Sequence, residues 1–301
     1  MGWKSFLSLM FFLVVISLLF FYWFIPWNEI EFGIKEKNSN FSLSGLDKGN
    51  TQFYPNMRYP SPEISYKISG CPLKKKNDME QAFDILNNKT ILRFYSVDKS
   101  EEISVTCDSN AKVEGGMFIA GEGGPINITK TNNFNVILNG KILLLRESEC
   151  ERPNIAIHEL LHALGFEHSP NPNNIMYNFS KCSQIIGDDT FELINKLYSV
   201  PSYSDLDFED VSAIMRGKYL DLNISVRNNG LVESGAAKIE IYADDKFLKE
   251  IELNPIDIGY GRIIILSNVW VPKISVKELK FFINSSFNEL DKNNNVIVLK
   301  I

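Results

Sequence analysis

All three histidines of the chain lie in one window of eleven residues, which reads H-E-L-L-H-A-L-G-F-E-H from position 158 to position 168. Positions i and i+4 share one face of a helix, so His158 and His162 are expected to direct both imidazoles at one point. Gly165 can take the left-handed conformation that ends a helix, and that turn would return His168 as a third ligand. Three protein nitrogens with one open position are typical of a catalytic zinc site.

Two further observations support a catalytic ion over a structural one. A structural zinc usually has four protein ligands, often with cysteine among them, and no cysteine lies in this window. Glu159 follows the first histidine, close enough to reach a water bound to the same metal. The residues therefore predict one catalytic Zn²⁺ held by His158, His162 and His168.

The window resembles the zinc signature H-E-x-x-H-x-x-G-x-x-H of the metzincin metallopeptidases. Ser169 follows the third histidine and Met176-Tyr177 comes shortly after it, which is most similar to the matrixin branch. The resemblance implies that Met176 forms the methionine turn, a packed apolar floor beneath the histidines. In branches with a tyrosine ligand, that residue lies two positions past the methionine, where this chain has Asn178, so Tyr177 is not assigned to the metal.

The mechanism that this resemblance implies is metal-assisted hydrolysis of a peptide bond. Zinc lowers the pKa of its bound water and polarises the scissile carbonyl. Glu159 is expected to accept the proton of the water as general base and to pass it to the leaving amine. Many matrixins also hold a second zinc bound by histidines, and this chain has no histidine left to build one.

A hydrophobic run near the N-terminus predicts a membrane anchor in residues 1–27. Residues 6–25 carry no charge, and a helix of this length spans roughly 30 Å, the thickness of a bilayer core. Bulky side chains precede the exit without an A-x-A-like cleavage site, so we favour a retained anchor over a cleaved signal peptide. Lys4 before the run and Glu29 after it predict a cell-membrane protein with its N-terminus in the cytoplasm and residues 28–301 outside.

The cysteine content agrees with that location. Four cysteines follow the anchor, and none has C-x-x-C metal spacing, which favours disulfides in an oxidising compartment. Of three possible pairings we prefer Cys71–Cys107 and Cys150–Cys182, because the second brackets the zinc helix and the methionine turn. Four buried free thiols are the alternative.

Composition divides the rest of the chain into a linker and two domains. Residues 28–54 are polar and indicate a juxtamembrane linker, and residues 55–200 are expected to form the catalytic domain. Strands are predicted over 63–68, 91–97 and 103–107, with helices over 77–87 and 190–198. Asn139-Gly140 between two apolar runs indicates a hairpin. The glycines at 115–116 and 121–124 line the substrate cleft or form a plain surface loop.

Residues 205–301 contain about seven short apolar runs, typical of an immunoglobulin-like sandwich. The segments 225–230 and 288–294 resemble landmarks of CARDB domains, a prokaryotic cell-surface module. No residue pattern in this half carries chemistry, so it is expected to act as a spacer or to bind a surface partner.

The sequence thus predicts an α+β fold: a metzincin-like zinc peptidase domain with a twisted sheet and a zinc helix, then an all-β immunoglobulin-like sandwich, after an N-terminal transmembrane helix. The predicted function is a zinc endopeptidase, anchored in the lipid bilayer through residues 6–25, that cleaves proteins or peptides outside the cytoplasm. The alternative is a surface adhesion or scaffold protein with a structural or vestigial zinc domain. A structural Ca²⁺ would suit the many carboxylates, although no loop has a calcium-binding pattern. The net charge of −6 argues against a nucleic acid partner.

Overall fold

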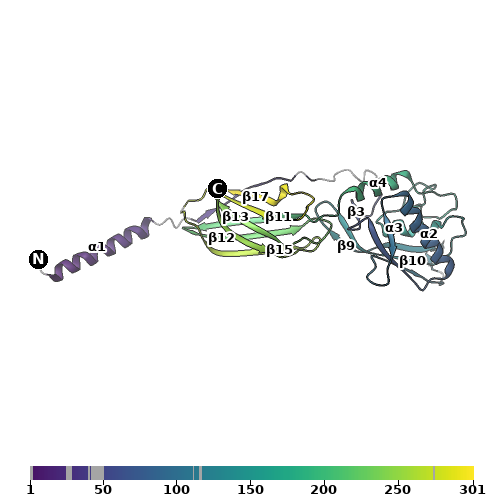
Figure 1. The fold of residues 1–301 in the computed structure, drawn as a ribbon, viewed down its shortest axis with the longest axis horizontal. Coiled ribbons are helices and arrows are strands. Elements are labelled where there is room, and N and C mark those ends of the chain that lie inside the picture. Colours follow the sequence, from purple (N-terminus) through teal and green to yellow (C-terminus); the bar gives the residue numbers. More distant parts are fainter. Residues whose placement is uncertain are drawn as a thin grey trace.

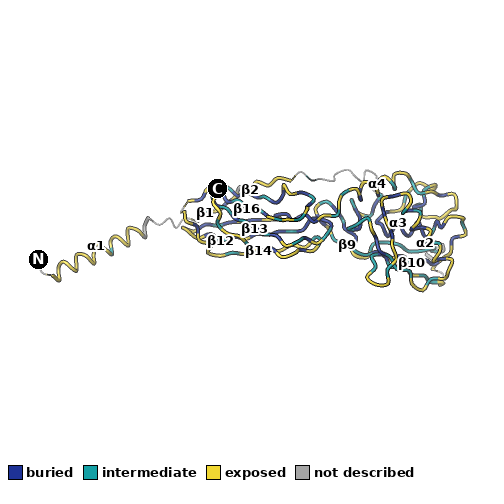
Figure 2. Tube along the Cα trace, in the orientation of Figure 1, coloured by how far each residue is buried: buried dark blue, intermediate teal, exposed yellow. Residues whose placement is uncertain are grey.

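The chain forms an elongated molecule of three parts, in which a β-sandwich lies between the N-terminal helix and an α/β domain (Figure 1). The computed structural model describes residues 3–24, 29–39, 41, 51–110, 112–114, 117–273 and 275–301. The α/β domain comprises residues 51–200, and the sandwich comprises residues 29–37 and 206–300. Each of the two has its own buried interior (Figure 2).

Helix α1 (Trp3–Phe24) extends away from the end of the sandwich that is opposite the α/β domain (Figure 1). Its Trp3–Phe21 segment has a mean hydropathy of 2.3, and none of it is buried. By length and composition, α1 can cross a membrane or act as a signal sequence. Ile25, the last residue of the predicted span, lies outside the described residues.

The α/β domain is built on a six-stranded sheet with the strand order β3-β10-β6-β4-β5, in which β9 also pairs with β10. The strands are β3 (Met57–Arg58), β4 (Glu63–Ser69), β5 (Arg93–Ser96), β6 (Ile103–Cys107), β9 (Gly121–Lys130) and β10 (Asn135–Leu144). All pairings are parallel except that of β9 with β10. A small pair, β7 (Val113–Glu114) and β8 (Met117–Phe118), stands apart from this sheet, and Gly115-Gly116 lie outside the described residues.

Three helices complete this domain: α2 (Leu73–Lys89), α3 (Asn154–Ala163) and α4 (Asp188–Ser199). Apolar residues at helical spacing, among them Met79, Phe83 and Leu86, form the buried face of α2, as expected for an amphipathic helix. Helix α2 packs against α3, and α3 also packs against β9 and β10. The predicted disulfides Cys71–Cys107 and Cys150–Cys182 are confirmed, with Cα–Cα separations of 4.9 and 5.2 Å.

The hairpin predicted at Asn139-Gly140 is wrong. Strand β10 runs through both residues, with irregular register between Ile137 and Gly140. A Cβ at position 140 would lie 2.3 Å from the Tyr59 hydroxyl, which donates a hydrogen bond to Ala163 O at 3.1 Å. Position 140 therefore needs glycine because the Tyr59 side chain approaches it closely. In the sequence, a glycine required for this reason cannot be distinguished from a glycine in a turn.

The sandwich consists of two antiparallel sheets. The first has the order β1-β11-β12-β15 and the second the order β14-β13-β16-β17-β2. The C-terminal strands are β11 (Leu206–Arg216), β12 (Tyr219–Asn228), β13 (Ala237–Ala243), β14 (Lys246–Leu253), β15 (Gly261–Trp270), β16 (Glu278–Asn284) and β17 (Val296–Lys300), with a short helix η1 (Asn293–Asn295) before β17. Alternate residues of β12, β13 and β16 are buried, the pattern of strands that cover one core.

The prediction that residues 28–54 form a linker is wrong where the structure describes strands in it. Strand β1 (Glu29–Glu31) pairs with β11, and strand β2 (Ile34–Lys37) pairs with β17. Phe32, between them, is 3% exposed in the sandwich core. The sequence did not reveal these strands because the segment is mostly polar. Each strand is short and pairs with a longer strand, so Phe32 between them is the main buried apolar contact. Residues 42–50 lie outside the described residues.

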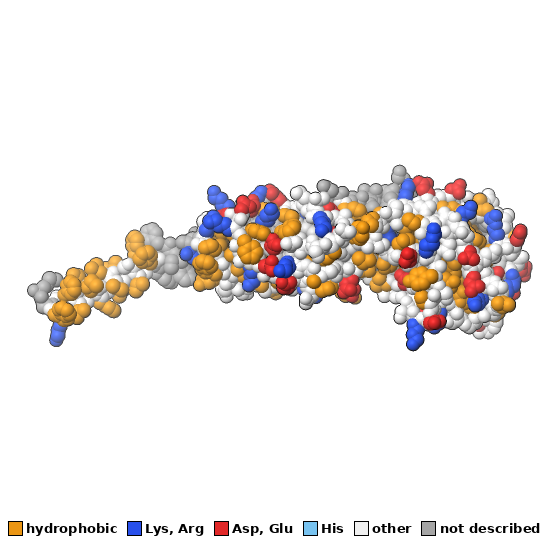
Figure 3. Space-filling model, viewed as in Figure 1, with side chains coloured by type: hydrophobic (Ala, Val, Ile, Leu, Met, Phe, Trp, Pro, Cys, Tyr) orange, Lys and Arg blue, Asp and Glu red, His pale blue; other side chains and the backbone are white. Residues whose placement is uncertain are grey.

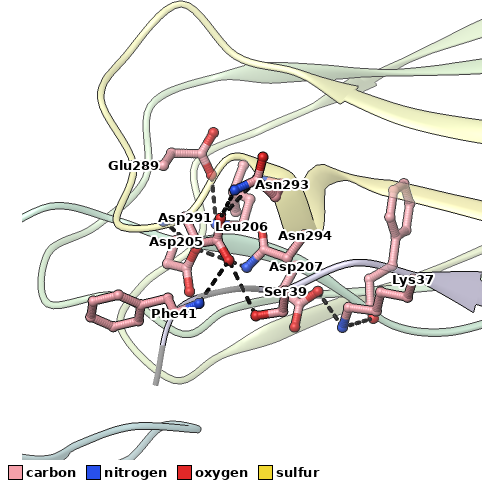
Figure 4. A network of polar contacts seen from close by, with 11 residues as sticks. Lys37, Ser39, Phe41, Asp205, Leu206, Asp207, Glu289, Asp291, Asn293 and Asn294 are labelled. Carbon is pink, nitrogen blue, oxygen red and sulfur yellow. Dashed lines mark hydrogen bonds and ion pairs between the residues drawn. The ribbon is translucent and has the colours of Figure 1, made fainter. Parts of the chain in front are cut away.

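The two ends of the chain thus meet in one sandwich, and a network of polar contacts holds them together (Figure 4). Lys37 forms an ion pair with Asp207. Ser39 Oγ and Phe41 N both donate hydrogen bonds to Asp291 Oδ2, at 3.1 and 3.3 Å. Asn294 Nδ2 and Asp291 N donate to Asp205 Oδ1, at 3.0 and 3.3 Å. These contacts fix Lys37, Ser39 and Phe41 to the sandwich end that faces the α/β domain.

The carboxyl group of Asp205 makes the stability of this network depend on pH. Burial raises the pKa of Asp205 to about 7, and the nearby Asp207 and Glu289 carboxylates act in the same direction. The unfolded chain has an aspartate pKa of about 3.9, so the native state holds the proton more tightly. The contribution of protonated Asp205 to the free energy of unfolding is therefore fully present below about pH 4, and it is lost as the pH rises through about 7.

We therefore expect Asp205→Asn to keep at pH 8 the stability that the wild-type chain loses between about pH 4 and pH 7. The difference should be at most about 4 kcal/mol, from about 1.4 kcal/mol for each pKa unit. Urea denaturation followed by circular dichroism at pH 5 and pH 8 measures it. Equal pH dependence in both proteins would contradict the assignment.

The α/β domain and the sandwich share a buried contact. Phe134 and Val136 of the α/β domain form an apolar cluster with Leu231 of the sandwich. Beside it, the fully buried Arg58 donates hydrogen bonds to the carbonyl oxygens of Leu197 and Val200, and thereby fixes the segment that joins the domains. Burial lowers the pKa of Arg58 to about 10, so its guanidinium stays charged at neutral pH.

Candidate metal centre

Helix α3 carries three of the predicted site residues. Ile157, Leu160 and Leu161 are buried in the core of the α/β domain, and this packing fixes which face of the helix remains free. The remaining face presents His158 and His162 to a cavity that Glu159 also lines, and His162 and Glu159 are both buried, at 7% and 5% exposure. The i, i+4 spacing therefore places both imidazoles on one face of the helix, as the sequence predicted.

The chain reverses directly after α3. Gly165 has a φ of +93°, and its amide donates a hydrogen bond to His162 O at 2.9 Å. A Cβ at this position would lie 2.9 Å from Met57 Cβ, so both the backbone conformation and the packing require glycine. The turn returns His168 to the other two histidines.

The three imidazoles converge on one point. His162 Nε2 lies 3.0 Å from His158 Nε2 and 3.1 Å from His168 Nε2. Together the three residues form a group that could hold a metal ion. Two nitrogens bound to one zinc at roughly 2.0–2.1 Å can be no more than about 4 Å apart, and both distances satisfy that limit.

Backbone carbonyl groups set the protonation of two of these rings. His158 Nδ1 lies 2.7 Å from Ile175 O, and His162 Nδ1 lies 2.8 Å from Phe166 O. A carbonyl oxygen only accepts, so each Nδ1 carries the hydrogen and each Nε2 keeps its lone pair. Burial lowers the pKa of His158, and lowers that of His162 to about 4. Neutral rings with convergent lone pairs are the donor set that zinc requires, so the residues fit this ion.

The residues predicted to form the methionine turn contact the candidate site through the carbonyl group of Ile175. Ile175, whose carbonyl orients His158, directly precedes Met176, which is 2% exposed in the domain core. Met176 O accepts a hydrogen bond from Ser169 N at 2.8 Å. This bond ties the segment after His168 to the turn.

Glu159 lies against strand β9, where glycines make room for it. A Cβ on Gly121 would lie 2.8 Å from Glu159 Oε1, and a Cβ on Gly123 would lie 2.2 Å from Glu159 O. Burial and the charge of Glu122 raise the pKa of Glu159 to about 8, against a hydrogen bond from the Gly123 backbone. A cation at the three imidazoles would oppose both effects. The sequence left open whether residues 121–124 line the substrate cleft or form a surface loop. Gly121 and Gly123 line the cavity that contains the three histidines.

Gly123→Ala is expected to destabilise the α/β domain by roughly 1–3 kcal/mol, because either β9 or α3 must move away from the new methyl group. Gly124→Ala is the matched control, since a Cβ there meets nothing within 4 Å. Thermal unfolding of the two variants measures the difference. Equal melting temperatures would contradict the contact between β9 and α3.

A cavity of about 1470 Å³ opens from the histidines and Glu159. The segments 145–150 and 177–182 line this cavity, and the Cys150–Cys182 disulfide joins them. The disulfide thus fixes the wall of the cavity as well as the loop before α3. A cavity of this size has room for a peptide segment beside the three histidines.

Contacts of Thr51 and Phe53 with the histidine segment were not predicted from the sequence. Phe53 stacks on His162 with 5.8 Å between ring centroids, and its amide donates to Gly165 O at 2.9 Å. Glu167 N donates to Thr51 O at 2.8 Å. The predicted linker therefore ends before Thr51, and the α/β domain begins earlier than residue 55. Three large side chains at 52–54 in a polar stretch were the available signal.

Residues 59–199 match the model of the matrixin family, so the chain contains a matrixin-like domain that includes all three histidines. No curated protein matches the chain. Among solved structures, a CARDB domain from Pyrococcus furiosus, determined in complex with di-metal ions, is similar at 16% identity; the match covers 33% of this chain and 87% of that one, with a TM-score of 0.28. The family match supports a zinc metallopeptidase.

Proposed function

We propose that the protein is a zinc-dependent endopeptidase that is anchored in the membrane by residues 6–25 and cleaves proteins or peptides outside the cytoplasm. The observation that carries this proposal is the convergence of three imidazole Nε2 atoms beside a buried carboxylate in one cavity. The matrixin match over residues 59–199 supports the same reaction class.

His158, His162 and His168 would hold the ion. When bound, zinc with an open fourth position supplies a Lewis acid that activates water and polarises a carbonyl group. The contribution of the chain is orientation, since the Ile175 and Phe166 carbonyls fix two of the rings before any metal binds. Such fixed outer partners keep ligands in one geometry and strengthen metal binding.

Glu159 would act as the general base. It accepts a proton from the attacking water and donates it to the amine that leaves. Its position one residue after His158 on α3 and its contact with Gly121 restrict the carboxylate to the side of the cavity that the histidines share. A restricted base loses little freedom when the substrate binds.

The test is peptide hydrolysis by residues 28–301, which keep both N-terminal strands of the sandwich. The protein is loaded with zinc and incubated with a mixed peptide library, with Glu159→Ala as control. Cleavage that the control lacks would support the peptidase and give its specificity. No cleavage by a folded, zinc-loaded protein would contradict it and favour the adhesion or scaffold alternative.

A further inference from the structure

The end of the sandwich next to α1 carries a cluster of exposed aromatic residues. Tyr219 and Trp270 are register partners on β12 and β15, with 52% and 57% exposure, and Phe247 at the start of β14 is 59% exposed. Lysines lie beside each of them. We call this cluster the aromatic corner and define it by Lys218, Tyr219, Lys246, Phe247, Trp270 and Lys273.

The aromatic corner is continuous across the two sheets. Val271, which follows Trp270, donates a hydrogen bond to Lys218 O at 2.8 Å. Val271 and Phe247 line the same small hollow, together with Lys246 and Lys273. Figure 3 shows hydrophobic, basic and acidic side chains together at this end of the sandwich. Lys273 pairs with Asp244, whereas Lys218 and Lys246 form no ion pair with any described residue.

Chain length holds this corner close to the end of α1. Strand β1 begins at Glu29, which pairs with Arg216, two residues before Lys218. Five residue steps separate Phe24 from Glu29, so their Cα atoms are at most about 18 Å apart at 3.6 Å for each step. The headgroup layer of a bilayer adds roughly 5–8 Å on each side of the hydrocarbon core. If α1 spans the membrane, the corner lies within reach of that layer.

The chemistry of the corner suits phospholipid headgroups. Tyrosine and tryptophan favour the interface between hydrocarbon and water because one end of each ring system is apolar and the other is wet. Lysines at this depth lie beside lipid phosphates. Along the rest of β12 the outward residues, such as Asn223 and Ser225, are polar, so on this strand the outward aromatic residue is Tyr219, at the end next to α1.

We propose that the aromatic corner sits in the headgroup layer of the bilayer that α1 enters, so that the sandwich stands on the membrane. The α/β domain, at the opposite end of the sandwich, then faces away from the bilayer (Figure 1). This inference rests on the anchoring part of the proposed function. Exposed Ile263 and Ile265 continue along β15, so a sandwich that lies flat on that edge is the arrangement to distinguish.

The test uses the full chain in phosphatidylcholine vesicles. Phenylalanine replaces Trp3, Trp23 and Trp27, which leaves Trp270 as the only tryptophan. The matched control also carries Trp270→Phe and Tyr260→Trp, because Tyr260 is 66% exposed and precedes β15 at its other end. Emission spectra and quenching by lipids brominated near the headgroup are measured for both.

We expect a blue-shifted emission and several-fold stronger lipid quenching for Trp270 than for the tryptophan introduced by Tyr260→Trp. Equal, weak quenching at both positions would overturn the proposal, and strong quenching at both would overturn it in favour of the flat arrangement. Vesicle flotation distinguishes the proposed membrane anchor from the proposed contact of the aromatic corner with headgroups. A chain that fails to float overturns both proposals. A chain that floats with Trp270 unquenched overturns the corner alone.

Discussion

Replacement of Glu159 by glutamine is expected to lower peptide turnover by roughly 10²–10⁴-fold while the zinc content stays unchanged. The amide keeps the shape of the side chain, which matters because the β9 glycines leave little space around it. It cannot accept a proton from water, so only the base is removed. Initial rates on a peptide identified from the library, with zinc measured by atomic absorption, test this expectation.

The control for that experiment is Glu167→Gln, which neutralises an exposed glutamate in the same histidine window. Turnover of this variant should equal that of the wild type. If Glu159→Gln also turned over normally, proton transfer by Glu159 would be excluded. If instead it lost zinc, the residue would be needed for the metal site and not for the chemical step alone.

The second large effect concerns His162. Its Nε2 is the central one of the three, at 3.0 and 3.1 Å from the others, so His162→Ala leaves two nitrogens without their common neighbour. We expect zinc affinity to fall by more than about 100-fold, beyond the loss typical for an outer hydrogen-bond partner, and hydrolysis to disappear with it. Zinc titration and peptide turnover measure both, and His158→Ala should behave alike.

Loss of zinc could also follow from loss of structure, since His162 is buried and stacks on Phe53. The circular dichroism of metal-free wild-type protein and of metal-free His162→Ala should therefore coincide. We expect them to do so because the core of the domain and both disulfides are independent of the histidines. Full zinc occupancy in folded His162→Ala would refute its role as a ligand.

The candidate site was largely accessible from sequence because its parts are close together along the chain. His158, Glu159 and His162 lie on one helix, and a single glycine turn with φ of +93° adds His168. Local geometry of this kind depends on helical spacing and on one backbone conformation. The disulfide Cys150–Cys182 was predictable for a related reason, since it brackets the same short segment.

Features that depend on contacts between residues far apart in the chain could not be predicted from the sequence. Gly140 was interpreted as a turn, although it makes room for the hydroxyl of Tyr59, 81 positions earlier in the chain. Phe53 was assigned to a linker, although its ring stacks on His162. Neither residue has a neighbour in sequence that reveals its role, because the contact forms only after the sheet and helices have packed.

The sequence by itself predicted three histidine ligands with a carboxylate beside them, a preferred pairing of the cysteines and an apolar N-terminal helix, because local spacing and composition carry these signals. Only the tertiary structure decided that residues 29–37 complete the sandwich through β1 and β2. Edge strands of three and four residues carry almost no periodic signal, and the backbone of a distant strand selects them. That pairing places the sandwich between α1 and the α/β domain, although the α/β domain comes first in the chain (Figure 1).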